Sequence, residues 1–126
     1  MRNLSAAGIL LLSVFLASLA FAADPLGESA KKSGRPLIAD FGLNVCKQCI
    51  RQSEAMEQFR KEVGEKLDTR FIHVAKEADT AGAYKVMLIP TLIFFDGQGR
   101  EVFRQVGYMP FEDMMTKARE LGLLPR

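Results

Sequence analysis

Cys46 and Cys49 are the residues of this sequence best suited to covalent chemistry. They are its only cysteines, and two residues separate them. A disulfide that closes so short a loop removes little conformational entropy from the unfolded chain, so the pair is poorly suited to stabilising a fold. Two thiols at this spacing can instead be oxidised and reduced by thiol–disulfide exchange. We therefore predict a redox role for this pair.

The pair lies where a predicted strand gives way to a predicted helix. Residues 36–41 form an apolar run typical of a strand buried on both faces, and a helical pattern runs from Cys46 to about Leu67. A thiolate at a helix N-terminus faces unpaired N–H groups and the positive end of the helix dipole, which lowers its pKa. We expect Cys46 to be exposed and to attack, and Cys49 to lie beneath it and resolve the mixed disulfide. Lys47 adds a positive charge near the thiolate.

Asp40 places a carboxyl group inside the apolar strand. An ionised, unpaired carboxylate there costs several kcal/mol, so its pKa should be raised. One interpretation is an Asp at the end of the strand that reaches solvent or caps a turn. Because the cysteines follow closely, we favour a buried proton acceptor for Cys49 during exchange.

Pro90 precedes the clearest strand of the sequence, residues 91–95. A proline removes one donor from a strand ladder, so it is unusual at such a position. We expect a cis-proline at the first residue of the strand, which leaves the preceding backbone, at Ile89, free to pair with an extended peptide.

A metal site is the main alternative for the cysteines. Zinc needs about four protein ligands, or three and a water. The sequence has one histidine, His73, and no third cysteine, so we expect no metal. A non-catalytic chaperone for Cu(I), which prefers thiolates, remains an alternative of a different class.

The remaining pattern predicts an α/β fold. Apolar periodicity and turn residues give the order helix, strand, helix, strand, helix, strand, strand, helix. Alternation followed by a hairpin and a closing helix predicts a central mixed β-sheet flanked by helices on both faces. Asp79 or Thr80 is expected to cap the third helix. The predicted elements span residues 24–34, 36–41, 46–67, 69–75, 79–86, 91–95, 100–106 and 110–121.

The pattern of the N-terminal residues predicts an export signal. Arg2 precedes an uncharged apolar stretch, and Ala20-Phe21-Ala22 supplies a small-x-small cleavage pattern. The predicted organisation is a signal peptide over residues 1–22 and one domain over residues 23–126; an uncleaved anchor in the inner membrane is the alternative. Charge is nearly balanced, with 17 Lys and Arg against 15 Asp and Glu. This argues against nucleic acid as a partner.

Taken together, these motifs resemble the thioredoxin superfamily. The shared frame runs from about Gly34 to Leu121 and includes Asp40-Phe41, Cys46-x-x-Cys49, Tyr84-x-Val86-x-x-Ile89-Pro90-Thr91, Asp96-Gly97 and Gly107. Within the superfamily, residues 90–101 and 106–109 look most like the C-terminal domain of the transmembrane thiol reductase that brings electrons into the periplasm. The resemblance implies the thioredoxin fold, Cys46 as nucleophile, Cys49 as resolving thiol and Asp40 as the buried carboxylate. It also implies a substrate surface formed by Val45, Lys47, Ile89, Pro90 and Gly107.

Several positions depart from the thioredoxin pattern. Val45 replaces the usual Trp, Lys47-Gln48 replaces Gly-Pro, and Phe71 stands where a Lys often accompanies the buried Asp. The usual first β-strand has no counterpart before Pro36. These differences leave the reaction class intact, but they affect the redox potential and the choice of partner, because both depend on the local environment.

The sequence thus predicts a periplasmic enzyme, a protein-disulfide reductase without a dissociable cofactor. Its expected partners are exported proteins with disulfides, and a membrane thiol reductase is its expected electron donor. A monomer is expected. An oxidant of the same fold that introduces disulfides is the closest alternative, and a low pKa at Cys46 would favour it.

Overall fold

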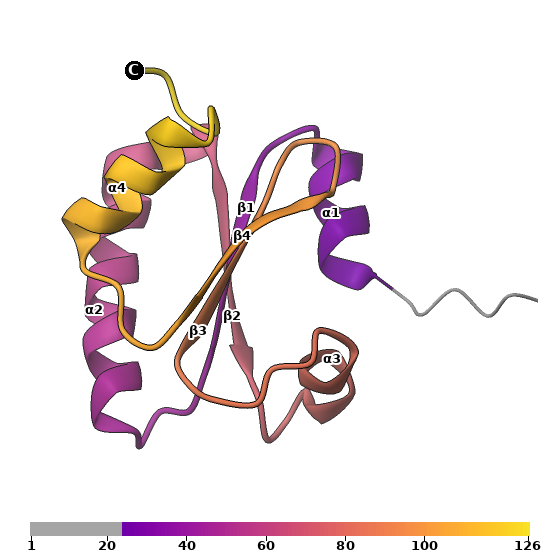
Figure 1. The fold of residues 1–126 in the computed structure, drawn as a ribbon, viewed down its shortest axis with the longest axis vertical. Helices are drawn as coiled ribbons and strands as arrows, with labels where there is room; N and C mark the ends of the chain where they lie inside the picture. The colour runs from indigo at the N-terminus through magenta and orange to yellow at the C-terminus, as the bar shows by residue number, and fades with distance from the viewer. Residues whose placement is uncertain (1–23) are drawn as a thin grey trace, which may run out of the picture.

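The computed structural model describes residues 24–126, so the predicted signal peptide lies outside the described residues. A four-stranded sheet, in the order β2-β1-β3-β4, forms the central layer. Helices α2 and α4 cover one face, and α1 and α3 lie on the other (Figure 1). The helices are α1 (Pro25–Ser33), α2 (Lys47–Val63), α3 (Ala78–Ala83) and α4 (Phe111–Glu120), and the strands are β1 (Leu37–Gly42), β2 (Asp68–His73), β3 (Thr91–Phe95) and β4 (Glu101–Val106).

The sheet is mixed, as predicted. Strand β1 pairs parallel with β2 and antiparallel with β3, and β4 pairs antiparallel with β3 at the edge. Strands β1 and β3 are buried along their whole length, because apolar clusters pack against both faces. Alternate residues point to opposite faces, so Ile38 packs toward α2 and α4 whereas Leu37 and Ala39 pack toward α1 and α3.

Two helix boundaries differ from the sequence prediction. Helix α2 ends at Val63, because Gly64 has a φ of +56°. A 3₁₀ turn, η1 (Gly64–Lys66), follows the helix. Helix α3 begins after Glu77, and no side chain caps it. The prediction that Asp79 or Thr80 caps this helix was therefore wrong: Asp79 and Thr80 lie inside its first turn.

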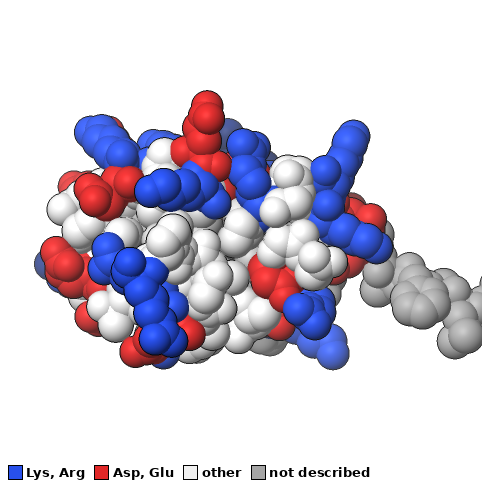
Figure 2. All heavy atoms as spheres, turned by 90° about the horizontal axis from the view of Figure 1, so that it is seen from above, with Lys and Arg blue, Asp and Glu red and all other residues white. Residues whose placement is uncertain are grey.

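Charges of both signs are mixed on the molecular surface. On the face seen in Figure 2, lysine and arginine side chains lie beside aspartate and glutamate side chains. Within residues 24–126, no helix is both long enough and apolar enough to cross a membrane.

Helix α1 approaches the turn between β3 and β4 closely at Gly27 and Gly99. A Cβ atom added to Gly99 would lie 2.3 Å from the Gly27 carbonyl oxygen, and Gly99 has a φ of +82°. Gly122 has a similar φ of +72° with no atom within 4 Å of an added Cβ. Positive φ disfavours alanine at both positions, but only Gly99 adds a backbone clash.

We therefore expect Gly99→Ala to lower the free energy of unfolding by about 3 kcal/mol and Gly122→Ala by about 1 kcal/mol. Urea denaturation of both variants measures the difference. Equal losses would mean that the Gly27–Gly99 contact does not hold α1 in place.

Candidate active site

Three chain segments meet at one end of the sheet. Thr91 on β3 pairs with Phe41 near the end of β1 and with Val106 at the end of β4. The segment after β1, which leads to Cys46, therefore starts next to Pro90. The segment after β4 starts there too, and the Gly107 N–H donates a hydrogen bond of 2.8 Å to the Pro90 carbonyl oxygen.

Cys46 is the N-cap residue of α2. Its half-buried Sγ atom accepts a hydrogen bond of 3.3 Å from the backbone N–H of Cys49. The Cys49 thiol also lies within hydrogen-bonding reach of Cys46. These two hydrogen bonds lower the pKa of Cys46 below its ordinary value, and the bond to the Cys49 thiol has the larger effect. A hydrogen bond with the Gln48 backbone lowers it further. The geometry favours a Cys46 thiolate at the helix N-terminus.

Cys49 has the opposite environment. Only 2% of its surface is exposed, and it lies close to Gly42, where an added Cβ would be 3.4 Å from the Cys49 Sγ. Burial, followed by the hydrogen bond to Cys46, raises the pKa of Cys49 to about 11, and the Asp40 charge contributes. Both cysteines are free thiols. One thiol is thus suited to attack, and the other stays protonated until a base removes its proton.

Asp40 lies on the same face of β1 as Ile38, toward α2. It is 3% exposed, and its Oδ1 atom is the only buried side-chain nitrogen or oxygen of residues 24–126 without a hydrogen-bond partner. Burial raises the pKa of Asp40 to about 7. The interpretation as a solvent-reaching or turn-capping Asp is therefore wrong.

Asp40 also lines a pocket of about 210 Å³ between α2 and β2. Ser53 and Thr69 contribute hydroxyl groups to its wall, and Phe71, which pairs with Asp40 across the two strands, contributes an aromatic ring. The side chain that stands where thioredoxins often carry a Lys is therefore apolar here, and it gives the carboxylate no counter-charge.

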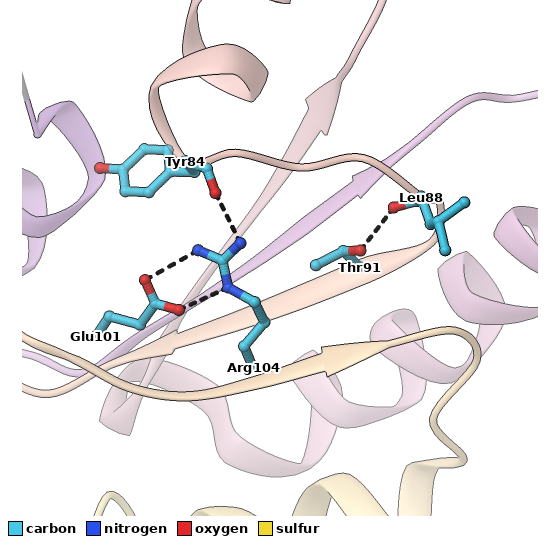
Figure 3. Close-up of polar contacts among 5 residues, drawn as sticks. All are labelled: Tyr84, Leu88, Thr91, Glu101 and Arg104. Atoms are coloured by element: carbon cyan, nitrogen blue, oxygen red, sulfur yellow. Dashed lines mark hydrogen bonds and ion pairs between the residues drawn. The ribbon is translucent and has the colours of Figure 1, made fainter.

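The segment before Pro90 exposes apolar side chains and is anchored at both ends (Figure 3). The Arg104 guanidinium donates to the Tyr84 carbonyl oxygen at 2.7 Å, and the Thr91 hydroxyl donates to the Leu88 carbonyl oxygen at 2.6 Å. Met87 and Leu88 between these anchors are 87% and 66% exposed.

The other predicted substrate residues lie at this end of the sheet. The Ile89–Pro90 peptide bond is cis, Pro90 is buried and Ile89 is half-buried. Gly107, with a φ of +91°, is half-buried beside Pro90. Val45 is 86% exposed immediately before Cys46. Lys47 is exposed at the first position of α2, and its effect on the thiolate stays a prediction.

Residues 27–121 match the family model of the thioredoxin-like domain. The chain belongs to the thioredoxin-like family. It is 30% identical to thioredoxin of Alicyclobacillus acidocaldarius over 75% of its own length and 89% of the relative's. It is 37% identical to thioredoxin of Bacillus subtilis over 67% and 80% of the two lengths. This thioredoxin-like protein is a thiol–disulfide oxidoreductase.

Solved structures agree on the fold of the thioredoxin-like domain. Chloroplastic thioredoxin z superposes with a TM-score of 0.69 at 23% identity, over 75% of this chain and 86% of that one. Thioredoxin of Fasciola hepatica superposes with a TM-score of 0.63 at 27% identity, over 73% and 85% of the two chains. The finer resemblance, to a domain of a transmembrane thiol reductase, stays a prediction.

Sequence reasoning missed one buried polar residue of this thioredoxin-like domain. Gln52, one helical turn after Cys49, is fully buried and bonds the backbone of Met109. Its position in the helix could have indicated its burial, because Gln52 lies on the apolar face that Cys49 and Met56 define. Its partner is 57 residues away in sequence, so spacing along the helix could not reveal it.

Metal binding has no further support in the part of the chain that is described. Residues 24–126 contain no group of three or more His, Cys, Asp or Glu side chains placed to hold an ion. Cys46 and Cys49 are the only cysteines of the sequence, and both are free thiols. Binding of Cu(I) by these two thiols stays an alternative.

Proposed function

We propose that this protein is a periplasmic reductase that breaks disulfides in exported proteins. The observation that carries the proposal is the contrast within the cysteine pair. Cys46 is accessible, and hydrogen bonds at the start of α2 favour its thiolate. Cys49 is buried, with its pKa raised to about 11. This asymmetry gives the two thiols different steps in one reaction.

In the first step, the Cys46 thiolate attacks one sulfur of a substrate disulfide. A bond forms between Cys46 Sγ and that sulfur, the substrate S–S bond breaks, and the second substrate sulfur leaves as a thiolate that takes a proton from water. The N–H groups of Gln48 and Cys49 stabilise the attacking charge. The first product is a mixed disulfide between Cys46 and the substrate.

In the second step, Cys49 must lose its proton. Asp40 is the acceptor we propose, because it is buried close enough for its charge to affect Cys49 and its pKa of about 7 suits a base at neutral pH. The Cys49 thiolate then attacks Cys46 Sγ, so that the Cys46–Cys49 bond forms and the bond between Cys46 and the substrate sulfur breaks. That sulfur leaves as a thiolate and takes a proton from water, which completes the substrate dithiol. The pocket beside Asp40 gives the transferred proton access to solvent.

The substrate would contact the exposed apolar residues at the same end of the sheet. Val45 precedes the attacking cysteine, while Met87 and Leu88 precede Ile89. Exposed apolar patches of this kind mark binding surfaces. An extended peptide pairing with the Ile89 backbone, beside Pro90 and Gly107, would bring its disulfide to Cys46.

Export and electron supply complete the proposal. Support for the periplasm comes from residues 1–22, whose composition is that of a signal peptide. The reaction needs no dissociable cofactor, but each turnover leaves the cysteines oxidised. A membrane thiol reductase would return two electrons and two protons to the pair, and the protein would act as a monomer.

An oxidant of the same fold is the second candidate. The lowered pKa of Cys46 favours it, because stabilising the thiolate stabilises the reduced form and makes the disulfide a stronger oxidant. The two candidates share every residue role and differ in the direction of electron flow.

Fractionation and thiol trapping in the native host test the proposal. Cells are acid-quenched, and free thiols are alkylated with a maleimide that shifts mobility on a gel. We expect the protein in the periplasmic fraction with Cys46 and Cys49 mainly reduced. A mainly oxidised pair would support the oxidant, and a cytoplasmic protein would contradict export.

A further inference from the structure

Gln52 is a fully buried amide on the catalytic helix. Its Nε2 donates to the Met109 carbonyl oxygen at 3.1 Å, and its Oε1 accepts from the Met109 N–H at 2.8 Å. The same Nε2 lies 3.6 Å from the Met114 sulfur. Both ends of the amide are therefore used, and both main contacts go to one backbone residue.

A buried amide costs free energy unless it is hydrogen-bonded. An apolar side chain of similar size would fill the space between α2 and α4 without that requirement. What Gln52 adds is a pair of hydrogen bonds like those that a neighbouring strand would provide. They satisfy the N–H and carbonyl groups of Met109. Met109 lies after the end of β4, so no strand is paired with it.

The segment that Gln52 holds contains Gly107. Two hydrogen bonds and a short stretch of chain connect the catalytic helix to the substrate surface. Gln52 bonds Met109, Gly107 lies two residues before Met109, and the Gly107 N–H donates to the Pro90 carbonyl oxygen. On the outside, the Arg51 guanidinium lies 4.2 Å from the centre of the Tyr108 ring. The segment is thus fixed from the core by Gln52 and from the surface by Arg51.

We propose that Gln52 is a positioning residue for substrate recognition, which holds the Gly107–Met109 segment at a fixed place beside Cys46 and Pro90. The inference rests on the proposed function, because it treats Gly107 and Pro90 as substrate contacts. The hydrogen bonds of the Gln52 side chain go to Met109 and Met114 and not to the reacting sulfurs. Its loss should therefore weaken the binding of a protein substrate and leave the chemistry of Cys46 unchanged.

The test compares Gln52→Met with Gln58→Met, the same change at an exposed position of α2. Residues 24–126 of each variant are assayed on two substrates. Insulin is the protein disulfide, and in that assay dithiothreitol regenerates the dithiol. In a separate assay, 5,5′-dithiobis(2-nitrobenzoate) is the small disulfide. We expect Gln52→Met to raise the KM for insulin about five- to tenfold, with kcat and the small-disulfide rate changed less than about twofold. Gln58→Met should behave as the wild type.

A purely structural role would give a different pattern. Parallel losses with insulin and the small disulfide, or an unchanged KM for insulin, would overturn the inference while the proposed function stands. A wild-type protein that does not reduce insulin would overturn both. If Gln52→Met does not fold, Gln52→Leu, which also lacks the donor and the acceptor, must show the same KM effect. In the wild type, fast hydrogen exchange at the Met109 N–H would also contradict the inference.

Discussion

Replacing Cys49 with alanine is expected to stop turnover and leave one substrate molecule bound to each protein. Cys46 is still half-buried and accessible in this variant. The hydrogen bond from the Cys49 thiol is lost, but the backbone N–H of residue 49 still donates to the Cys46 sulfur. Attack on a disulfide therefore proceeds, but no thiol is left to release the mixed disulfide. We expect multiple-turnover reduction of insulin to fall by more than about a thousandfold. Mass spectrometry under non-reducing conditions should detect a 1:1 adduct.

Cys46→Ala is the matched control. The remaining thiol, Cys49, is 2% exposed, and burial, the largest cause of its raised pKa, is unchanged in this variant, so it should neither turn over nor form an adduct. Adduct formation at similar rates in the two variants would contradict the roles assigned to the two cysteines. Because each change removes one sulfur, the comparison depends on exposure and pKa alone.

Asp40→Asn is expected to stabilise the reduced protein at alkaline pH. The pKa of Asp40 lies at about 7 when folded, against an ordinary 3.8, so the folded state holds this proton more tightly than the unfolded state. The folded protein therefore loses stability as pH rises from about 4 to about 7, and the full loss remains above pH 7. At about 1.4 kcal/mol per pH unit, Asp40 costs up to about 4 kcal/mol at pH 8. Urea denaturation should find this gain at pH 8 and almost none at pH 4.

The same variant should slow the second chemical step. Asn cannot accept the proton of Cys49, so we expect release of the mixed disulfide to slow by about 100-fold at pH 7, while attack by Cys46 is little changed. Single-turnover kinetics separates the two steps. Equal slowing of attack and release would contradict the role of Asp40 as proton acceptor.

Phe71→Lys tests the raised pKa of Asp40 by adding a positive charge instead of removing the carboxylate. Phe71 pairs with Asp40 across the strands and lines its pocket, so a lysine there would place a cation beside the carboxylate. The pKa of Asp40 should fall by about one unit or more. Val102→Lys, on the edge strand β4, is the control and should leave it unchanged. A carboxyl NMR titration measures both.

Much of this site could be predicted because it depends on local sequence. Cys46 and Cys49 had to flank the start of a helix, since an apolar strand precedes them and a helical pattern follows. Burial of Asp40 was favoured over a position that reaches solvent or caps a turn, because the residue sits within an apolar run and the cysteines follow closely. These predictions use chain neighbours only, and periodicity carries that information.

The parts that could not be predicted depend on residues far apart in the chain. The partner of Gln52 is Met109, and the anchor of Tyr84 is Arg104; neither pair shares a helix or strand. The start of α3 was also missed: the helix begins after Glu77 without a side-chain cap, although Asp79 and Thr80 are residue types that often cap helices. Sequence periodicity identifies elements and their faces, but it does not specify which loop each face meets.

The reduction potential of the Cys46–Cys49 couple distinguishes a reductase from an oxidant. The domain of residues 24–126 is equilibrated with dithiothreitol buffers of known ratio, and the fraction oxidised is measured after acid quenching and alkylation. We expect a value near that of thioredoxin, about −270 mV, which suits electron delivery to disulfides of exported proteins. A value near −120 mV, that of a strong disulfide donor, would contradict a reductase and reverse the direction of electron flow.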